Sequence, residues 1–235
     1  MKAIIKNGAA QPVALVIDDD QLFRRSIARI LEAHGYTTAA YESLAQFTAA
    51  KAIPQFGCAI LDLNLPDSNG LQIQDRLTRV APALAVIFLT GFGQVSSSVR
   101  AMKAGAVDFL EKPVEDSVLL QAVERAVERS RSLYEERREL EELQLRFRSL
   151  SARERDVFAL ITSGLLNKQA GAELGIKEKT IKVYRAQLMA KMRAASFAEL
   201  VKIAQRLGLK RTSLSPISSN RTNWTVTTTD GSANS

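Results

Sequence analysis

The sequence contains only one cysteine and one histidine among its 235 residues. A single cysteine, Cys58, cannot form a disulfide within the chain. Zinc sites need several sulfur or imidazole ligands, and Ser/His or Cys/His hydrolases need a histidine beside the nucleophile. His34 precedes Gly35, where we expect a helix to end, so we predict a surface role for it. The residue counts therefore exclude these classes of site.

Long apolar runs are also missing. No run approaches the roughly 18 residues of a membrane-spanning helix, and residues 1–12 lack the apolar segment of a signal peptide. We therefore expect a cytoplasmic protein without membrane contact, with a flexible N-terminus at 1–11. Residues 211–235 are rich in Ser, Thr and Asn and have too little apolar content to fold, so they are predicted to be a disordered tail.

The excess positive charge lies in one part of the chain. Residues 1–130 contain 13 basic and 14 acidic residues, whereas residues 149–211 contain 13 basic and five acidic, a net charge of +8. This asymmetry predicts an anionic partner for the C-terminal part, with nucleic acid as the first candidate. A basic face that serves only solubility is the alternative that composition alone leaves open.

Short apolar segments alternate with helical patterns through the first half of the chain. Such alternation predicts a parallel β-sheet covered by helices on both faces. The five expected strands are Val13–Ile17, Tyr36–Ala40, Ala59–Asp62, Ala83–Leu89 and Val107–Leu110. The helices between them are expected after Asp20, at Ser43–Lys51, through Leu71 and Leu77, and at Gln94–Ala104.

Residues able to bind a cation and a phosphoryl group follow four of these strands. Asp18 and Asp19 end the first strand, Asp62 the third, Thr90 the fourth and Lys112 the fifth. Because the carboxyl ends of parallel strands meet at one edge of the sheet, we expect these side chains to converge. Three carboxylates, a hydroxyl and an ammonium group predict a site for Mg²⁺ and a phosphoryl group.

These residues closely resemble response-regulator receiver domains. The resemblance implies a flavodoxin-like (βα)5 receiver domain at 12–128, in which Asp62 accepts a phosphoryl group from a sensor histidine kinase. The matching text is Val-Ile-Asp18-Asp19-Asp20, Leu-Asp62-Leu-Asn-Leu-Pro66, Thr90-Gly91 and Phe109-Leu-Glu-Lys112-Pro113. The run from Val99 to Pro113 is similar to the FixJ-type subgroup in particular.

The resemblance also implies roles for the other site residues. It gives Mg²⁺ as the cofactor, with Asp18, Asp19, Asp62 and the backbone carbonyl of Asn64 as ligands. It gives Thr90 and Phe109 as the pair that moves on phosphorylation, Lys112 as the residue that stabilises the phosphoryl group, and a cis Lys112–Pro113 bond. The loop Asp67-Ser68-Asn69 departs from the family pattern by being more acidic and polar.

A long segment without proline or glycine follows the receiver pattern. Apolar residues recur every seven positions in it, at Leu119, Ala126, Leu133, Leu140 and Phe147. This predicts a long linker helix at 115–149 that overlaps the last receiver helix, and it favours a dimeric coiled coil. The alternative is a single solvated helix that lies along its own domains.

The basic C-terminal part has a helix-turn-helix pattern. Ser151 and Glu154 form a capping box, and a short helix capped by Asn167 ends at Gly175. A basic helix at 178–193 and a helix beginning at Ser196 complete four helices. The region at 149–210 is similar to the LuxR-type DNA-binding domain of NarL/FixJ response regulators. The matching text is Leu150–Val157, Gly164–Lys168, Glu173–Ile176, Thr180–Val183 and Met189–Met192.

This second resemblance implies a set of DNA contacts. Lys182, Val183 and Ala186 would face the major groove, and Lys168, Lys179, Thr180 and Arg185 would meet phosphates or base edges. Two positions depart from the family pattern. Lys177 stands where an N-capping serine is usual, a cap worth about 1 kcal/mol, and Tyr184 replaces a usual histidine.

Together the two resemblances predict a two-component response regulator and not an enzyme. Phosphorylation of Asp62 would promote homodimerisation and sequence-specific binding to promoter DNA, with RNA polymerase as a further partner. One alternative is a constitutive DNA-binding protein whose receiver takes no phosphate. Another is an aspartyl-phosphate phosphatase of the haloacid-dehalogenase type, which needs an acid/base aspartate where this chain has Asn64. A flavodoxin-type nucleotide binder is disfavoured, since Asp18–Asp20 would repel a phosphate.

Overall fold

A computed structural model describes residues 5–6, 9–10, 12–50, 53–91 and 101–209 of the chain. The chain divides into two compact units, Met1–Glu136 and Arg137–Ser235. The tail predicted at 211–235 and most of the helix predicted at Gln94–Ala104 lie outside the described residues.

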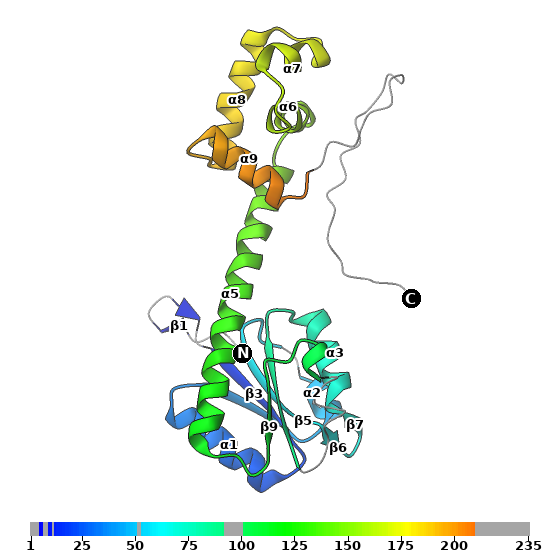
Figure 1. Cartoon of the computed structure of the whole chain (residues 1–235), viewed down its shortest axis with the longest axis vertical. Helices are drawn as coiled ribbons and strands as arrows, with labels where there is room; N and C mark the ends of the chain where they lie inside the picture. Colours follow the sequence, from blue (N-terminus) through cyan, green and yellow to red (C-terminus); the bar gives the residue numbers. More distant parts are fainter. Residues whose placement is uncertain (1–4, 7–8, 11, 51–52, 92–100, 210–235) are drawn as a thin grey trace. The chain divides into compact units, whose positions relative to one another are not determined.

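The N-terminal unit is built on a five-stranded parallel sheet (Figure 1). Its strand order is β4 (Thr37–Tyr41), β3 (Val13–Ile17), β5 (Gly57–Asp62), β8 (Ala85–Thr90) and β9 (Asp108–Glu111). This confirms the predicted flavodoxin-like fold, with strand ends shifted by one or two residues. Two short antiparallel pairs were not predicted: β1 (Ile5–Lys6) with β2 (Ala9–Ala10), and β6 (Asn64–Leu65) with β7 (Ser68–Asn69).

Helices cover both faces of this sheet. On one face α1 (Gln21–Ala33) and α5 (Asp116–Arg148) pack against alternate strand residues such as Val16 and Ile60. On the other face α2 (Leu44–Thr48) and α3 (Gly70–Val80) pack against the remaining ones. Every residue of β5 and β8 is buried, which explains why both strands read as continuous apolar runs rather than alternating ones.

Two of the predicted helix starts carry the expected side-chain caps. The carboxylate of Asp20 accepts hydrogen bonds from the amides of Leu22 and Phe23 and thereby begins α1. The hydroxyl of Ser43 accepts from the Gln46 amide and begins α2. In the structure α2 ends at Thr48, earlier than predicted. His34 is the exposed C-cap of α1, as expected.

The seven-residue repeat of α5 is divided between two cores. Leu119 and Ala126 are fully buried in the N-terminal unit, and Phe147 is buried in the C-terminal unit with Leu140 packed beside it. Leu133 is the one member that is exposed. Packing within each unit therefore accounts for most of the repeat. The dimeric coiled coil stays a prediction for the turns around Leu133.

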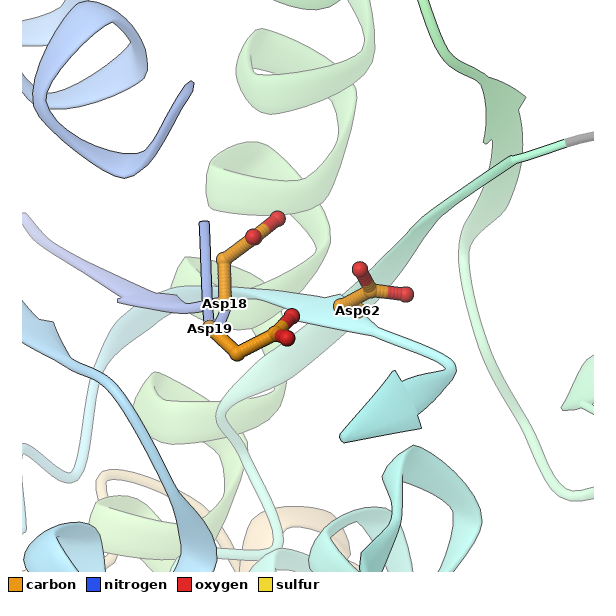
Figure 2. A group of neighbouring side chains, drawn as sticks. All are labelled: Asp18, Asp19 and Asp62. Atoms are coloured by element: carbon orange, nitrogen blue, oxygen red, sulfur yellow. The ribbon is translucent and has the colours of Figure 1, made fainter. Parts of the chain in front are cut away.

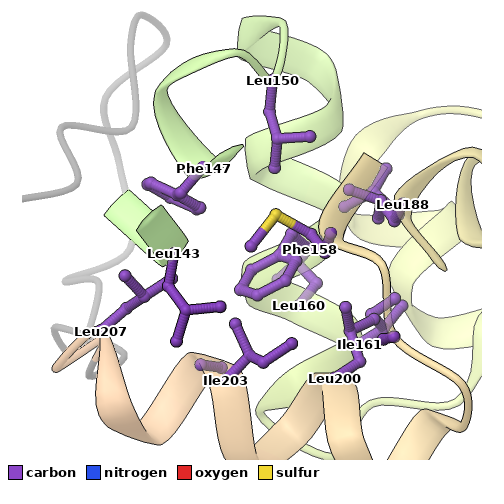
Figure 3. Packing of buried hydrophobic residues seen from close by; sticks show 14 of the residues in the cluster. Leu143, Phe147, Leu150, Phe158, Leu160, Ile161, Leu188, Leu200, Ile203 and Leu207 are labelled. Carbon is purple, nitrogen blue, oxygen red and sulfur yellow. The ribbon is translucent and has the colours of Figure 1, made fainter. Parts of the chain in front are cut away.

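As far as residue 209, the C-terminal unit consists of four helices and the end of α5. The helices are α6 (Ala152–Thr162), α7 (Asn167–Leu174), α8 (Glu178–Met192) and α9 (Phe197–Arg206). Figure 3 shows Leu143, Phe147 and Leu150 in the same apolar cluster as Phe158 and residues of α8 and α9. The core of this unit thus includes residues that precede the predicted boundary at 149.

The helix starts of this unit confirm one predicted cap and correct another. Ser151 and Glu154 form the predicted capping box, with hydrogen bonds of 3.2 and 2.8 Å. Asn167, however, is the first residue of α7 and not its cap, which is Leu166. The Leu166 amide donates to the Gln169 side chain, so the side chain of Asn167 is available for another contact. None of the helices in the described part of the chain combines the length and apolar composition that a bilayer crossing requires.

Candidate metal centre and nucleic-acid interface

The three predicted aspartates converge at the carboxyl edge of the sheet (Figure 2). Asp18 follows β3 directly, and Asp62 is the last residue of β5, which pairs with β3 in register. Carboxylate oxygens of Asp18, Asp19 and Asp62 lie within 4.8 Å of one another. Asp18 and Asp62 are buried, whereas Asp19 is exposed, so the cluster opens to solvent on one side.

Backbone amides fix the direction of the two buried carboxylates. Asp18 Oδ1 accepts a hydrogen bond of 2.9 Å from the Asp20 amide, and Asp62 Oδ1 accepts one of 3.0 Å from the Asn64 amide. In addition, the Arg24 guanidinium donates to the Asp18 carbonyl. The two amide contacts hold Oδ1 of each carboxylate and leave Oδ2 of each for Lys112, which follows β9.

Lys112 joins the two buried carboxylates. Its Nζ lies 2.5 Å from Asp18 Oδ2 and 2.6 Å from Asp62 Oδ2. The Lys112–Pro113 bond that follows is cis, as the resemblance to receiver domains implied. Burial lowers the pKa of Lys112, but its hydrogen bonds to the two carboxylates outweigh burial and leave that pKa raised. Burial raises the pKa of Asp18, and the hydrogen bond from Lys112 offsets this only in part.

The donor set fits a hard divalent cation. Mg²⁺ prefers oxygen ligands and keeps several waters, so a few carboxylates with one exposed side suit it. Asp18, Asp19 and Asp62 provide such carboxylates within ligand reach of one another. The part expected of the Asn64 carbonyl stays a prediction.

Thr90 and Phe109 stand near this cluster on neighbouring strands. Thr90 ends β8 and is almost fully buried, and its Oγ1 donates to the Gly91 carbonyl at 3.2 Å. The Lys112 amide donates to the Thr90 carbonyl at 2.7 Å, which ties the two strand ends together. The half-buried Phe109 ring lies 6.3 Å from that of Phe88. The movement expected of Thr90 and Phe109 stays a prediction.

The structure adds one residue that sequence patterns did not single out, Phe23, and gives a contact for Asp67 in the loop that departs from the family pattern. The Phe23 ring lies 4.4 Å from Lys112 Nζ, in cation–π geometry. Asp67, in the unusually acidic loop, accepts a hydrogen bond of 3.1 Å from the Ala45 amide in the first turn of α2. This hydrogen bond lowers the pKa of Asp67. Phe23 lies three residues after the Asp20 cap, so the sequence marks it only as a residue in the first turn of α1. Periodicity could not identify its contact with Lys112.

Five of the seven predicted DNA-contacting residues lie on one exposed face of α8. Helix residues three and four apart share a face. The buried stripe consists of Ile181, Leu188 and Met192. The opposite stripe is exposed and consists of Lys179, Thr180, Lys182, Val183 and Ala186. As expected from the sequence, Lys177 gives α8 no side-chain cap.

Not every residue of the implied DNA set is equally available. Lys168 is exposed on α7, and Val183 is 52% exposed, which is high for an apolar residue. Arg185 is only partly exposed, because it contacts side chains of the neighbouring helices. Tyr184 packs against the core, so the departure from histidine at this position concerns packing.

Two protein-family models match the chain, one within each of its two units. Residues 14–124 match the model of the response regulator receiver domain, which contains the acidic cluster. Residues 148–204 match the model of bacterial regulatory proteins of the luxR family, which contains α8.

Similar proteins match over nearly the whole chain. Nodulation protein W of Bradyrhizobium diazoefficiens is 40% identical over 86% of this chain and 88% of its own length. The transcriptional regulatory protein FixJ of Azorhizobium caulinodans is 40% identical over 83% and 92%. The solved structure of response regulator StyR has a TM-score of 0.74 at 35% identity, covering 84% of this chain and all of that one. Full-length FixJ from B. japonicum has a TM-score of 0.51 at 35% identity, covering 85% and 98%.

Proposed function

This chain belongs to the FixJ-type response regulators, and on that premise we propose that phosphorylation of Asp62 promotes its dimerisation and its binding to promoter DNA. Its receiver domain implies a histidine kinase as the phosphoryl donor. The observation that carries the proposal is the contact of Lys112 Nζ with both Asp18 and Asp62 at the open edge of the sheet. In this proposal residues 12–128 form the receiver domain.

Asp62 is proposed as the phosphoacceptor because the Asn64 amide fixes its carboxylate and the Lys112 ammonium group lies beside it. An oxygen of Asp62 forms a bond to phosphorus while the phosphorus–nitrogen bond of the donor phosphohistidine breaks, and the imidazole nitrogen keeps the electron pair of that bond. Lys112, already at Asp62 Oδ2, is placed to offset charge on the transferred group. Asp18, Asp19 and Asp62, with the Asn64 carbonyl, would hold Mg²⁺, which supplies further charge neutralisation at the phosphoryl oxygens.

The proposed switch uses the residues beside the cluster. A phosphoryl group adds up to about two negative charges. We propose that Thr90 leaves its contact with the Gly91 carbonyl and donates to that group, and that Phe109 turns inward. Dimerisation would then align two copies of α8 with a two-fold DNA site.

The DNA-binding step is proposed for the exposed face of α8, with Lys168 on α7. Lys182, Val183 and Ala186 would enter the major groove, and Lys168, Lys179, Thr180 and Arg185 would meet the backbone or base edges. Contact with RNA polymerase and a cytoplasmic location belong to the same proposal, since promoter binding requires access to both the DNA and the polymerase.

The test compares the wild-type chain with Asp62→Asn. Each is incubated with Mg²⁺ and beryllofluoride, and its mass is followed by light scattering and its binding to duplex DNA by anisotropy. We expect only the wild type to dimerise and to gain DNA affinity. Asp75→Asn is the matched control, because it makes the same change at an exposed carboxylate of α3 outside the cluster.

Other outcomes would separate the proposal from its alternatives. A wild type that binds DNA, while beryllofluoride changes neither its mass nor its DNA affinity, would indicate a constitutive DNA-binding protein. A dimer in both proteins without beryllofluoride would mean that α5 sets assembly. Turnover of a phosphate ester would favour a phosphatase.

A further inference from the structure

Arg185 lies on α8 but contacts the first residues of both neighbouring helices. Its Nη1 donates a hydrogen bond of 2.9 Å to Asn167 Oδ1, at the start of α7. The centre of its guanidinium group lies 4.4 Å from the centroid of the Phe197 ring, at the start of α9. One side chain therefore connects three consecutive helices on a flank of α8 that the apolar core does not cover.

Two further observations separate Arg185 from Lys179 and Lys182, the basic residues on the exposed face of α8. Lys179 and Lys182 are exposed, whereas Arg185 is partly buried. Lys182 pairs with Glu178 on the same helix at 3.2 Å, and both side chains are exposed, so the pair has little energetic weight. By contrast, the guanidinium of Arg185 donates from Nη1 to Asn167 while its central carbon lies over the Phe197 ring, and the more compact ammonium of a lysine is not shaped to make both contacts at once.

The partners of Arg185 also lack another explanation. Asn167 is not the cap of α7; the cap is Leu166, whose amide donates to the Gln169 side chain. Phe197 is 37% exposed and does not belong to the apolar core of the unit. A guanidinium placed over the ring face of an aromatic residue stabilises both groups, and the Arg185 guanidinium has this position over Phe197. The two side chains are therefore arranged around Arg185.

We propose that Arg185 is a positioning residue, held by Asn167 and Phe197, that fixes the rotation of α8 and so directs its exposed face at the bases. Ile181, Leu188 and Met192 hold the opposite side of α8 in the core. The Arg185 contacts hold its flank. Between them, these contacts define the direction of Lys182, Val183 and Ala186. The inference rests on the proposed DNA-binding function and refines it, since Arg185 itself was expected to meet the DNA.

The test measures DNA affinity of the full chain with Mg²⁺ and beryllofluoride. The probes are a 30-base-pair duplex selected from random sequence with the wild type and a mixed-sequence duplex of the same length. Anisotropy titrations at several salt concentrations give the affinity for each probe and the salt slope. The variants are Arg185→Lys, Arg185→Gln, Phe197→Leu, the double variant Arg185→Lys with Phe197→Leu, and Phe197→Tyr, which keeps an aromatic face.

We expect Arg185→Lys and Phe197→Leu each to weaken binding to the selected duplex by about two- to fivefold, the range for a cation–π contact. Binding to the mixed-sequence duplex and the salt slope should be unchanged. The double variant should match the single variants, because both remove the same contact. Phe197→Tyr should bind as the wild type does, because it keeps the ring face that Arg185 contacts.

Lys179→Gln is the control for a backbone contact. Removing one phosphate contact should lower the salt slope by about 0.9 for each DNA-binding unit and weaken both probes alike. The proposal is overturned if Arg185→Gln gives this same result while Phe197→Leu binds normally, or if Arg185→Lys retains full selectivity. Failure of the wild type to bind any duplex would instead refute the proposed function.

Discussion

Phe147 provides the sharpest test of how α5 connects to the DNA-binding helices. It is only 6% exposed, and its ring meets that of the fully buried Phe158 edge-on, with centroids 5.5 Å apart. Replacing a buried phenylalanine by alanine costs about 3–5 kcal/mol through lost burial and the cavity that remains. We expect Phe147→Ala to destabilise the C-terminal unit by about 3 kcal/mol.

The assay is urea unfolding of the full chain, with hydrogen exchange of peptides from α6 and α8 to assign the transition to the C-terminal unit. In thermal unfolding, the same loss of about 3 kcal/mol should lower the melting temperature of a domain this small by roughly 12 °C or more. Leu145→Ala is the matched control: Leu145 lies two residues away in the same helix and is 65% exposed, so a change within about 0.5 kcal/mol is expected. Equal effects of the two substitutions would refute the assignment of the last turns of α5 to this core.

Three further predictions concern other parts of the chain. Glu154→Gln should remove an acid-dependent part of stability: a hydrogen bond from Lys191 lowers the pKa of Glu154, so its contribution is present above the unfolded pKa of about 4.3 and is lost as the pH falls further. Between pH 3 and 7 the melting temperature of the variant should therefore depend less on pH than that of the wild type. Gly57→Ala should lower the free energy of unfolding in urea by more than about 2 kcal/mol. Gly57 has a φ of +129°, and a Cβ there would lie 2.0 Å from the Val13 carbonyl oxygen. Phe23→Leu should slow phosphorylation by acetyl phosphate about fivefold, because Lys112 loses its ring contact.

Each of these predictions has an outcome that contradicts it. An acid limb of the stability curve that is the same in Glu154→Gln and the wild type would show that this carboxylate is not coupled to folding. Wild-type stability of Gly57→Ala would mean that the strand can move aside. An unchanged phosphorylation rate in Phe23→Leu would limit the ring to packing.

The fold and the acidic site could be predicted because their signals are local. Each strand is a short apolar run, and Asp18, Asp62, Thr90 and Lys112 stand at strand ends that a parallel sheet must bring to one edge. The contact of Phe23 with Lys112 was beyond reach, because it joins residues far apart in the sequence through a geometry that no periodicity encodes.

The linker shows why a correct pattern can receive an incomplete explanation. Apolar residues at intervals of seven mark one face of a helix, but they do not say which surface covers that face. In α5 the face is covered by the N-terminal core at Leu119 and Ala126 and by the C-terminal core at Phe147. Asn167 was misassigned for a related reason: an asparagine at a helix start suits a cap, and only the tertiary contact with Arg185 shows its other use.

The unbroken course of α5 from Asp116 to Arg148 has a consequence for chimeric proteins and for insertions during evolution. Each residue added to a helix turns everything beyond it by about 100°, since one turn takes about 3.6 residues. Two residues inserted between Tyr134 and Leu140 would turn the following helix face almost to the opposite side, while seven would nearly restore it. We therefore expect functional fusions of this receiver with other DNA-binding units to tolerate linker lengths in steps of about seven residues rather than in any number.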